Sequence, residues 1–190
     1  MQKLQTYAEL VNKWSGTINL VSKTSLHDMW IRHFLDSAQI FPLAKVSSGH
    51  WVDLGSGGGF PGIVVAIIAS EKATGFRFTF VESDQRKAVF LQTVARILAL
   101  PITVVASRIE KIAPLSADIL SARALAPLET LIGYTDWHLK PAGQALLMKG
   151  ETFRREVDRA LEIWSFQSDE YPSITDGAAV ILSLGDIKRV

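Results

Sequence analysis

Apolar residues recur at helical spacing near the start of the chain. Those of the first periodic segment are Leu4, Tyr7, Ala8, Val11 and Trp14. Residues three or four apart share one helix face, so the pattern predicts a helix over residues 2–14. The polar segment 15–25 predicts a loop. Ser25, with Asp28 three residues later, resembles a capping box and predicts a second helix from there to about Phe41.

Beyond a connector over residues 42–49, short apolar runs alternate with helical periodicity. The predicted strands are 51–54, 76–82, 102–107, 117–122 and 145–150. The predicted helices cover approximately 62–69, 84–100, 127–138 and 151–162. Such alternation is typical of an α/β fold with a mostly parallel sheet and helices on both faces. Two last strands, 163–168 and 179–184, leave no room for a helix between them and are predicted to form an antiparallel pair.

Length and composition narrow the class of protein. The 190 residues fit a single domain, 1–190, with an N-terminal helical extension (1–48) and an α/β core (49–190). The chain has no cysteine, which excludes disulfides, cysteine-ligated metal and a cysteine nucleophile, and we expect no metal site. No apolar stretch approaches the roughly 20 residues of a membrane span, so we expect a cytoplasmic protein without membrane contact. With a net charge of only +1, nucleic-acid binding requires a local basic patch.

Candidate site residues follow from the predicted strand ends. Parallel sheets of this kind bind ligands beyond the C-terminal ends of their strands. The residues at these ends are Asp53, Gly55, Glu82, Ser107, Arg108, Ile109, Glu110, Arg123 and Lys149. We therefore expect them to gather at one edge of the sheet.

The densest signal is a glycine-rich segment between the first core strand and the helix after it. Its glycines are Gly55, Gly57, Gly58, Gly59 and Gly62. Glycine permits positive φ and close approach of a ligand to the backbone. Pro61 suits the start of a helix, whose N-terminal N–H groups can face a ligand. Glu82 ends the next strand, where its carboxylate can accept hydrogen bonds from ribose hydroxyls. We expect a nucleoside-containing cofactor here.

Two cofactor classes fit this pattern. Gly57, Gly59 and Gly62 have the G-x-G-x-x-G spacing of dinucleotide binders, with Glu82 following 20 residues after Gly62. From Asp53 onward, the same segment also has the D-x-G-x-G-x-G spacing of S-adenosylmethionine enzymes.

Three features favour S-adenosylmethionine. The dinucleotide register leaves Asp53 and Gly55 without a role. The chain has no room for the separate substrate domain that a dehydrogenase usually needs. Ile109 and Glu110 follow the third core strand, where a backbone amide and an acid suit the edge of an adenine ring.

At this point the sequence resembles a known family. The residues that carry the resemblance are RHFLDS (32–37), DLGSGGGFPG (53–62), VESDQRKAVFL (81–91), SRIE (107–110), SARALAP (121–127) and LLMKG (146–150). In this order and spacing they are similar to the bacterial 16S ribosomal RNA guanine-N7 methyltransferases, also called glucose-inhibited division protein B. The resemblance implies a Rossmann-like class I methyltransferase fold, S-adenosylmethionine as cofactor, and 16S ribosomal RNA or the small ribosomal subunit as partner. Nothing in the sequence indicates more than a monomer.

The resemblance also implies roles for individual residues. Cofactor contacts fall on Asp53, Gly55, Gly57, Gly59, Phe60, Glu82, Ile109, Glu110 and Arg123. Relatives often carry SRAFA where this chain has SARALA, and Arg123 aligns with the arginine of that segment. Candidate contacts to the guanine are Arg32, His33, Arg123 and Lys149, and candidate phosphate contacts at the rim are Arg86, Lys87, Arg154 and Arg155.

The residues agree with N7 chemistry. Methylation at carbon 5 of a pyrimidine generally needs a cysteine, and methylation of a base amino group often uses an N/D-P-P-Y/F motif; the chain has neither. Guanine N7 is a lone-pair nucleophile without a proton, so alignment suffices and no general base is expected. Arg123 and Lys149 are predicted to position the base by donating to O6 or phosphate, because N7 must stay free.

Other readings stay open at this stage. The same fold serves methyltransferases of small molecules or other bases, a nicotinamide-dependent oxidoreductase would use the alternative glycine register, and a module could bind the cofactor without transferring a methyl group. Trp14, Trp30 and Phe34 could stack on bases, but their helical spacing favours core packing. Asp36 is expected only to cap or pair locally.

Overall fold

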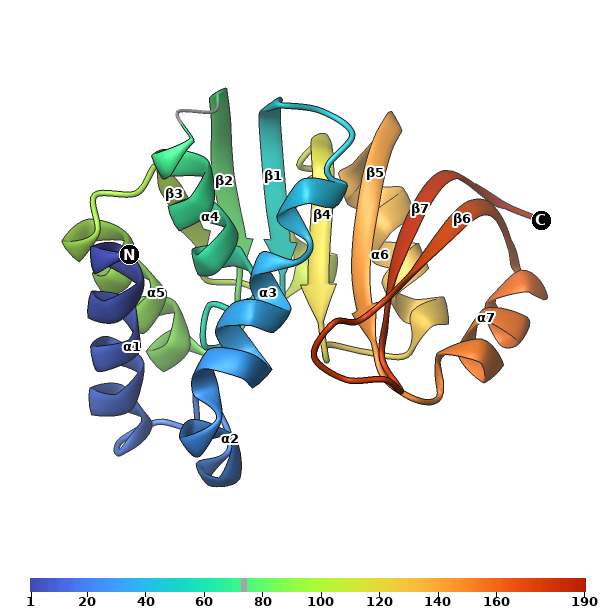
Figure 1. Ribbon diagram of the computed structural model, residues 1–190. Helices are drawn as coiled ribbons and strands as arrows, with labels where there is room; N and C mark the ends of the chain where they lie inside the picture. The colour runs from blue at the N-terminus through green and yellow to red at the C-terminus, as the bar shows by residue number, and fades with distance from the viewer. Residues whose placement is uncertain (73–74) are drawn as a thin grey trace.

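The computed structural model describes residues 1–72 and 75–190 and is built on a seven-stranded sheet (Figure 1). The strands are β1 (Ser48–Leu54), β2 (Gly75–Val81), β3 (Ile102–Val105), β4 (Ala117–Arg123), β5 (Leu139–Lys149), β6 (Trp164–Pro172) and β7 (Val180–Arg189). Their order is β3-β2-β1-β4-β5-β7-β6. The first five strands pair in parallel, and β7 is antiparallel to both β5 and β6. The mostly parallel sheet and the C-terminal antiparallel pair are confirmed.

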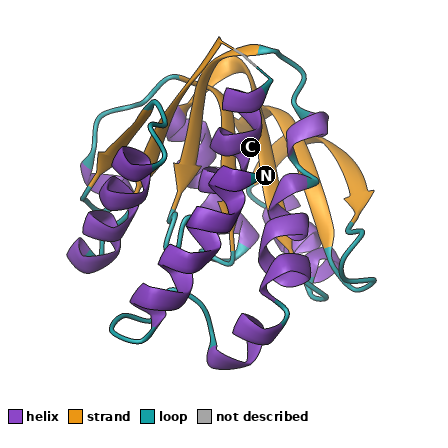
Figure 2. Ribbon diagram, turned by 60° about the vertical axis from the view of Figure 1, so that its left-hand side comes forward, coloured by secondary structure: helices purple, strands orange, loops and turns teal. Residues whose placement is uncertain are grey.

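Helices cover both faces of the sheet, as Figures 1 and 2 show. The N-terminal segment contains α1 (Gln2–Ser15), α2 (Lys23–His27), the π-helical turn η1 (Trp30–Leu35), α3 (Asp36–Ala38) and the 3-10 turn η2 (Phe41–Leu43). The rest of the chain contains α4 (Gly62–Glu71), α5 (Gln85–Ile97), the 3-10 turn η3 (Ile109–Lys111), α6 (Leu128–His138) and α7 (Phe153–Leu161).

Alternating strand residues point into two separate cores. Trp51 of β1 belongs to a core that includes residues of α1, α4 and α5, whereas its neighbour Val52 belongs to a core that includes residues of α6 and α7. Both positions are apolar because both faces are covered, which is why the strands read as continuous apolar runs. Trp14 and Phe34 belong to the first core, as their spacing predicted, while Trp30 is about half-exposed and packs on Phe34.

The segment predicted as one helix from Ser25 to Phe41 is instead broken into short pieces, so that prediction was wrong. Ser22 caps α2, its Oγ accepting from the backbone N–H of Ser25 at 3.2 Å. Ser25 is buried and its hydroxyl donates to the carbonyl of Ser22 at 2.9 Å. The wider η1 turn then follows, and Pro42 falls in η2. Local serine-to-backbone bonds compete with a continuous helix at this point.

Strand lengths were underestimated where the residues are polar. β5 begins at Leu139 and not near residue 145, and β6 and β7 continue to Pro172 and Arg189. Hydrophobic runs mark only the buried centre of a strand, whereas backbone pairing continues through exposed polar positions. Among the described residues, no helix is long and apolar enough to span a membrane.

Candidate functional site

The glycine segment connects β1 to α4 and depends on left-handed backbone. Gly55, Gly57 and Gly59 have backbone φ values of 63°, 53° and 91°, which residues other than glycine rarely adopt. A Cβ atom on Gly55 would also collide with the side chain of Leu125, in the loop after β4. The first glycine therefore lets two loops from neighbouring strands approach each other.

One side of this segment lines a cavity of about 330 Å³, named here the glycine-loop cavity. Its lining residues are Gly55, Gly57, Val81, Glu82, Ser83, Lys87, Ser107, Arg108, Ile109, Glu110, Ala124, Leu125, Ala126 and Tyr134. The cavity opens beyond the C-terminal ends of the parallel strands, as expected for this fold. Gly55, Gly57, Glu82, Ile109, Glu110 and Lys87, all predicted from the sequence, are brought together there.

The other side of the glycine segment faces the protein interior. A Cβ on Gly59 would lie 2.7 Å from the hydroxyl of Tyr7, and one on Gly62 would lie 2.7 Å from the ring of Phe80. Tyr7 of α1 also donates to the carbonyl of Gly58 at 2.5 Å. Gly59 and Gly62 therefore permit close packing and do not line the cavity. Tyr7 supports the loop from below, a role that helical periodicity alone could not reveal.

Glu82 is held rigidly at the wall of the cavity. Its Oε2 accepts from the backbone N–H of Gly57, and its Oε1 accepts from that of Asp84, both at 2.7 Å. These bonds leave acceptor capacity on both carboxylate oxygens. The position predicted to bind ribose hydroxyls thus presents a fixed carboxylate to the cavity.

Asp53, which the sequence predicts to contact the cofactor, is not among the residues that line the cavity. It is buried beneath the glycine segment, where its Oδ1 accepts from Ser121 Oγ at 2.6 Å, while Ser121 accepts from Trp51 Nε1 at 2.9 Å. Its Oδ2 has no hydrogen-bond partner within the described residues and lies against Gly62, the first residue of α4. Burial raises the pKa of Asp53 to about 6, against the opposing effects of Ser121, Ser56 and Arg123.

That carboxylate bears on which cofactor the loop can hold. A dinucleotide places its pyrophosphate at the N-terminus of the helix after the loop. Here the start of α4 is covered by buried Asp53, and Gly62 packs on Phe80. A phosphate there would meet a carboxylate and no open space. The residues therefore fit a cofactor without a pyrophosphate.

Arg123 ends β4 on the sheet face covered by the N-terminal segment, outside the glycine-loop cavity. It donates to Asp36 Oδ2 at 3.1 Å and to the carbonyl of Arg32 at 3.2 Å. Its second terminal nitrogen lies 3.0 Å from His33 Nδ1, and its guanidinium lies 5.3 Å from the centre of the Phe60 ring. Phe60 is buried in this cluster and, like Arg123, does not line the glycine-loop cavity.

His33, predicted to contact the guanine, is a half-buried member of the same cluster. Its ring stacks on Phe60 with centroids 4.9 Å apart. Burial, with the charge of Arg123, lowers its pKa to about 4, so the ring is neutral at pH 7. Because Arg123 donates to Nδ1, the proton sits on Nε2 and is donated to Ser25 Oγ at 2.9 Å.

Asp36 has a larger role than the sequence suggested. Besides the ion pair with Arg123, its Oδ1 accepts from Gln39 Nε2 and Thr175 Oγ1, both at 2.8 Å. Ser173 Oγ lies 3.5 Å away. Asp36 thus joins the N-terminal segment, the end of β4 and the β6–β7 connection. These partners lie far apart in sequence, so no local pattern could signal the contact.

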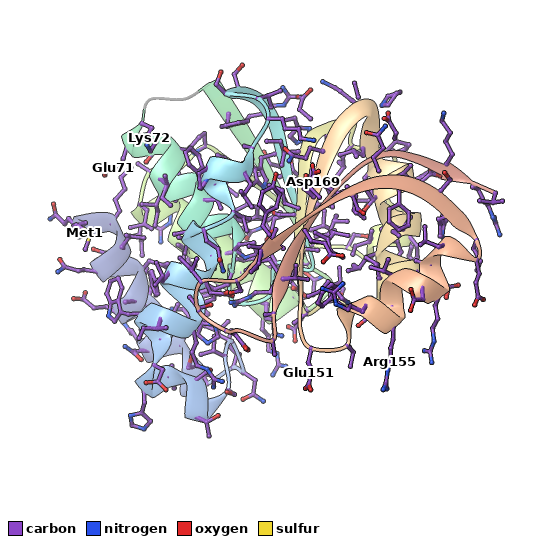
Figure 3. The ribbon with its side chains drawn as sticks, turned by 45° about the vertical axis from the view of Figure 1, so that its right-hand side comes forward. Met1, Glu71, Lys72, Glu151, Arg155 and Asp169 are labelled. Carbon is purple, nitrogen blue, oxygen red and sulfur yellow. The ribbon has the colours of Figure 1, made fainter. Side chains whose placement is uncertain are left out.

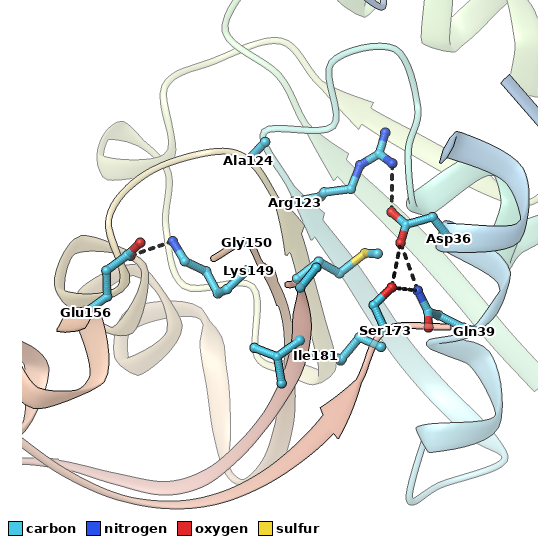
Figure 4. A pocket seen from close by; sticks show the side chains of 12 residues that line it. Asp36, Gln39, Arg123, Ala124, Lys149, Gly150, Glu156, Ser173 and Ile181 are labelled. Carbon is cyan, nitrogen blue, oxygen red and sulfur yellow. Dashed lines mark hydrogen bonds and ion pairs between the residues drawn. The ribbon is translucent and has the colours of Figure 1, made fainter. Parts of the chain in front are cut away.

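A second cavity of about 220 Å³, named the β5 cavity, opens next to Arg123 (Figure 4). Its lining residues are Asp36, Gln39, Arg123, Ala124, Met148, Lys149, Gly150, Glu156, Ser173, Ala179, Val180 and Ile181. Lys149 forms an ion pair with Glu156 at 2.7 Å and donates to the carbonyl of Ala126 at 3.0 Å. The two cavities share Ala124, whose φ of 50° is strained for a residue with a side chain.

The predicted phosphate contacts are scattered over the surface. Arg86 pairs with Asp84 at 3.3 Å, and Arg154 pairs with Glu170 at 3.4 Å. Arg155 is exposed and projects outward from α7 (Figure 3). Arg32 is exposed and borders a hollow beside the β5 cavity, with Asp36 in both linings.

Within the part of the chain that the structure describes, no cluster of three or more His, Cys, Asp or Glu residues is arranged to hold a metal ion.

Comparisons with known proteins agree with this geometry. The family model described as rRNA small subunit methyltransferase G matches residues 1–181. Proteins named ribosomal RNA small subunit methyltransferase G are similar over the whole chain: one from Cereibacter sphaeroides is 50% identical, covering 99% of this chain and 90% of its own, and one from Ruegeria pomeroyi is 47% identical, covering 100% and 92%.

Solved structures support the fold. A SAM-dependent methyltransferase from Aquifex aeolicus superposes with a TM-score of 0.63 at 12% identity, covering 93% of this chain and 97% of its own. A putative S-adenosyl-L-methionine-dependent methyltransferase from Methanococcus maripaludis gives a TM-score of 0.59 at 15% identity, covering 94% and 91%. At these identities the likeness concerns the fold, and the Rossmann-like methyltransferase architecture expected from the sequence is confirmed.

The Asp53→Asn variant should change how stability depends on pH. Since folding raises the pKa of Asp53 from 3.8 to about 6, its contribution is fully present below pH 3.8 and is lost as pH rises through 6. Relative to the variant, the wild type should be about 1 kcal/mol more stable at pH 5 than at pH 8, as measured by urea unfolding. A difference between the two proteins that is independent of pH would contradict this.

The Tyr7→Phe variant should be less stable than the wild type by about 1 kcal/mol, because the buried carbonyl of Gly58 loses its donor. The midpoint of urea denaturation reports this loss. Tyr171→Phe is the matched control, since the Tyr171 hydroxyl has no hydrogen-bond partner among residues 1–72 and 75–190. Equal midpoints for the two variants would show that Tyr7 does not support the loop.

Proposed function

The chain belongs to the rRNA small subunit methyltransferase G family, and we propose that it transfers the methyl group of S-adenosylmethionine to N7 of a guanine in 16S ribosomal RNA. The observation that carries this proposal is the meeting of two cavities at the end of β4. The glycine-loop cavity and the β5 cavity are lined by different residues but share Ala124. Two ligands bound there would lie side by side, as a transfer reaction between them requires.

The glycine-loop cavity has the features needed to hold S-adenosylmethionine. The carboxylate of Glu82 would accept hydrogen bonds from the ribose, and the segment at Ile109 and Glu110 would border the adenine. Gly55 and Gly57 expose backbone to the cavity without a side chain in between. When bound, the cofactor supplies an electrophilic methyl group on a sulfonium. Phe60 and Arg123 contact each other outside this cavity, with the Arg123 guanidinium over the Phe60 ring.

The carboxylates of the β5 cavity suit a reaction that needs no general base. Asp36 is paired with Arg123, and Glu156 is paired with Lys149. Burial alone would raise the pKa of Glu156, but its bonds from Lys149, Leu128 and Thr152 outweigh this effect and lower it. A carboxylate with a lowered pKa is a poor proton acceptor at pH 7. Guanine N7 carries no proton, so the cavity has only to hold and orient the base.

The RNA would approach over the open side of both cavities. Lys87 borders the glycine-loop cavity and Arg32 borders the hollow next to the β5 cavity. Arg155 adds exposed positive charge, whereas Arg86 and Arg154 are partly neutralised by Asp84 and Glu170. With a net charge of +1, we propose recognition of a structured site in 16S RNA or in the small ribosomal subunit, by a cytoplasmic monomer.

The Glu82→Gln variant should bind S-adenosylmethionine about 10- to 100-fold more weakly than the wild type, because the variant keeps the side-chain size but loses charge-assisted hydrogen bonds. Isothermal titration measures the affinity. Glu71→Gln, which changes a carboxylate at the end of α4 far from the cavity, is the control (Figure 3). Unchanged affinity in Glu82→Gln would remove Glu82 from the ribose-binding role.

Incubation with isotopically labelled S-adenosylmethionine and small ribosomal subunits that lack the modification should produce labelled 7-methylguanosine. Nuclease digestion followed by mass spectrometry identifies the product. Label on a pyrimidine carbon or an exocyclic amine would contradict N7 as the acceptor.

Titration with NADH tests the alternative cofactor register: binding of NADH without binding of S-adenosylmethionine would overturn the proposed function.

A further inference from the structure

The β5 cavity is flanked by two ion pairs that differ in what they have left to offer a ligand. Arg123 with Asp36 forms one wall, and Lys149 with Glu156 forms the opposite wall (Figure 4). Met148 and Ile181 add apolar side chains to the lining. A flat ring entering the cavity would therefore meet charged groups at its edges.

On the first wall the Asp36 carboxylate is nearly filled, while Arg123 uses three of its five N–H donors, on Asp36, the carbonyl of Arg32 and His33. The Asp36 carboxylate accepts from Arg123, Gln39 and Thr175, with Ser173 nearby. A carboxylate has about four acceptor positions, so little remains for a ligand. This wall maintains the shape of the cavity.

The Lys149 wall keeps one donor and one acceptor free, side by side. Lys149 has three N–H donors and uses two, on the carbonyl of Ala126 and on Glu156. Glu156 accepts from Lys149, the backbone N–H of Leu128 and Thr152 Oγ1, which leaves about one of its acceptor positions. Both side chains are mostly buried, with Lys149 10% and Glu156 19% exposed. A buried donor or acceptor without a partner costs free energy, which a ligand that completes the hydrogen bond recovers.

The order of these groups matches one base edge. Ala126, whose carbonyl is bound by Lys149, lines the glycine-loop cavity, whereas Leu128 and Glu156, which are bonded to each other, do not. The donor therefore lies nearer the glycine-loop cavity than the acceptor does. In guanine, O6 is the acceptor next to N7, and the N1–H donor follows O6. In adenine the group next to N7 is an amino donor, which would face the Lys149 ammonium.

We propose that the β5 cavity binds the target guanine, with Lys149 donating to O6 and Glu156 accepting from N1–H, so that N7 faces the glycine-loop cavity. This assignment rests on the proposed function and names the residues that select the base. Glu156 was not among the site residues expected from the sequence. The β5 cavity is smaller than pockets for drug-sized ligands, whose volumes start at roughly 300 Å³. A cavity of this size suits a single base.

The test is a cycle of enzyme and substrate changes. The methylated guanine is first mapped with the wild type, and a second RNA then carries 2-aminopurine at that position, which keeps N7 but lacks O6 and N1–H. Glu156→Gln and Lys149→Met should each lower kcat/KM on the guanine substrate about 10- to 100-fold, with the affinity for S-adenosylmethionine unchanged in calorimetry. Glu151→Gln, an outward-pointing carboxylate nearby, should behave as the wild type (Figure 3).

The decisive readout is non-additivity. Replacing guanine by 2-aminopurine should slow the wild type about 10- to 100-fold but should cost the double variant Lys149→Met/Glu156→Gln little more, because both contacts are already lost in it. If the double variant and the base change act additively, Lys149 and Glu156 act only on loop structure and the inference is overturned. Failure of the wild type to methylate any 16S RNA substrate would instead refute the proposed function, which keeps the two failures distinct.

Discussion

The ion pair between Arg123 and Asp36 is the contact on which the arrangement of the site depends. Arg123 is the last residue of a central strand, and Asp36 comes from the N-terminal segment. Because the same carboxylate accepts from Thr175, the β6–β7 connection is tied to the same point. Three parts of the chain thus meet where the strands end. Loss of either partner would leave the other charge mostly enclosed, at 17% and 16% side-chain exposure, with the walls of the β5 cavity unsupported.

The glycine segment exposes backbone to the cavity on one side and packs closely against the protein interior on the other. Toward the cavity, Gly55 and Gly57 expose backbone, and Gly57 donates to Glu82. Toward the interior, Gly59 and Gly62 admit Tyr7 and Phe80 at distances that a Cβ would forbid. A loop that is open on one face and close-packed on the other keeps its shape without a ligand. Its position is therefore set before any cofactor binds, which reduces the ordering cost of binding.

Much of the fold could be predicted because its signals are local. Periodicity located the core strands, and the glycine spacing located the loop at the end of β1. The sequence does not show on which face of the sheet the residues at a strand end lie, and therefore which loops they contact. Asp53 and Arg123 were both expected at the cofactor, yet Ser121, Asp53 and Arg123 lie on the face covered by the N-terminal segment. Glu156 went unnoticed because an acid in an amphipathic helix is normally a solvated one.

The distribution of charge explains how a nearly neutral protein can act on RNA. Of the cations near the two cavities, Arg123 and Lys149 are paired with carboxylates inside the site. Because the neighbouring carboxylates compensate their charges, these two cations contribute directional hydrogen bonds more than long-range attraction to RNA. The 20 basic residues of the chain are balanced by 19 acidic ones, so attraction of the whole protein to phosphate is weak at physiological salt. Selectivity must then come from the fit of one base into a shaped cavity, and that fit depends on the folded RNA presenting the base. A charge-balanced protein with a preformed base pocket favours recognition of one structured site over binding along any strand.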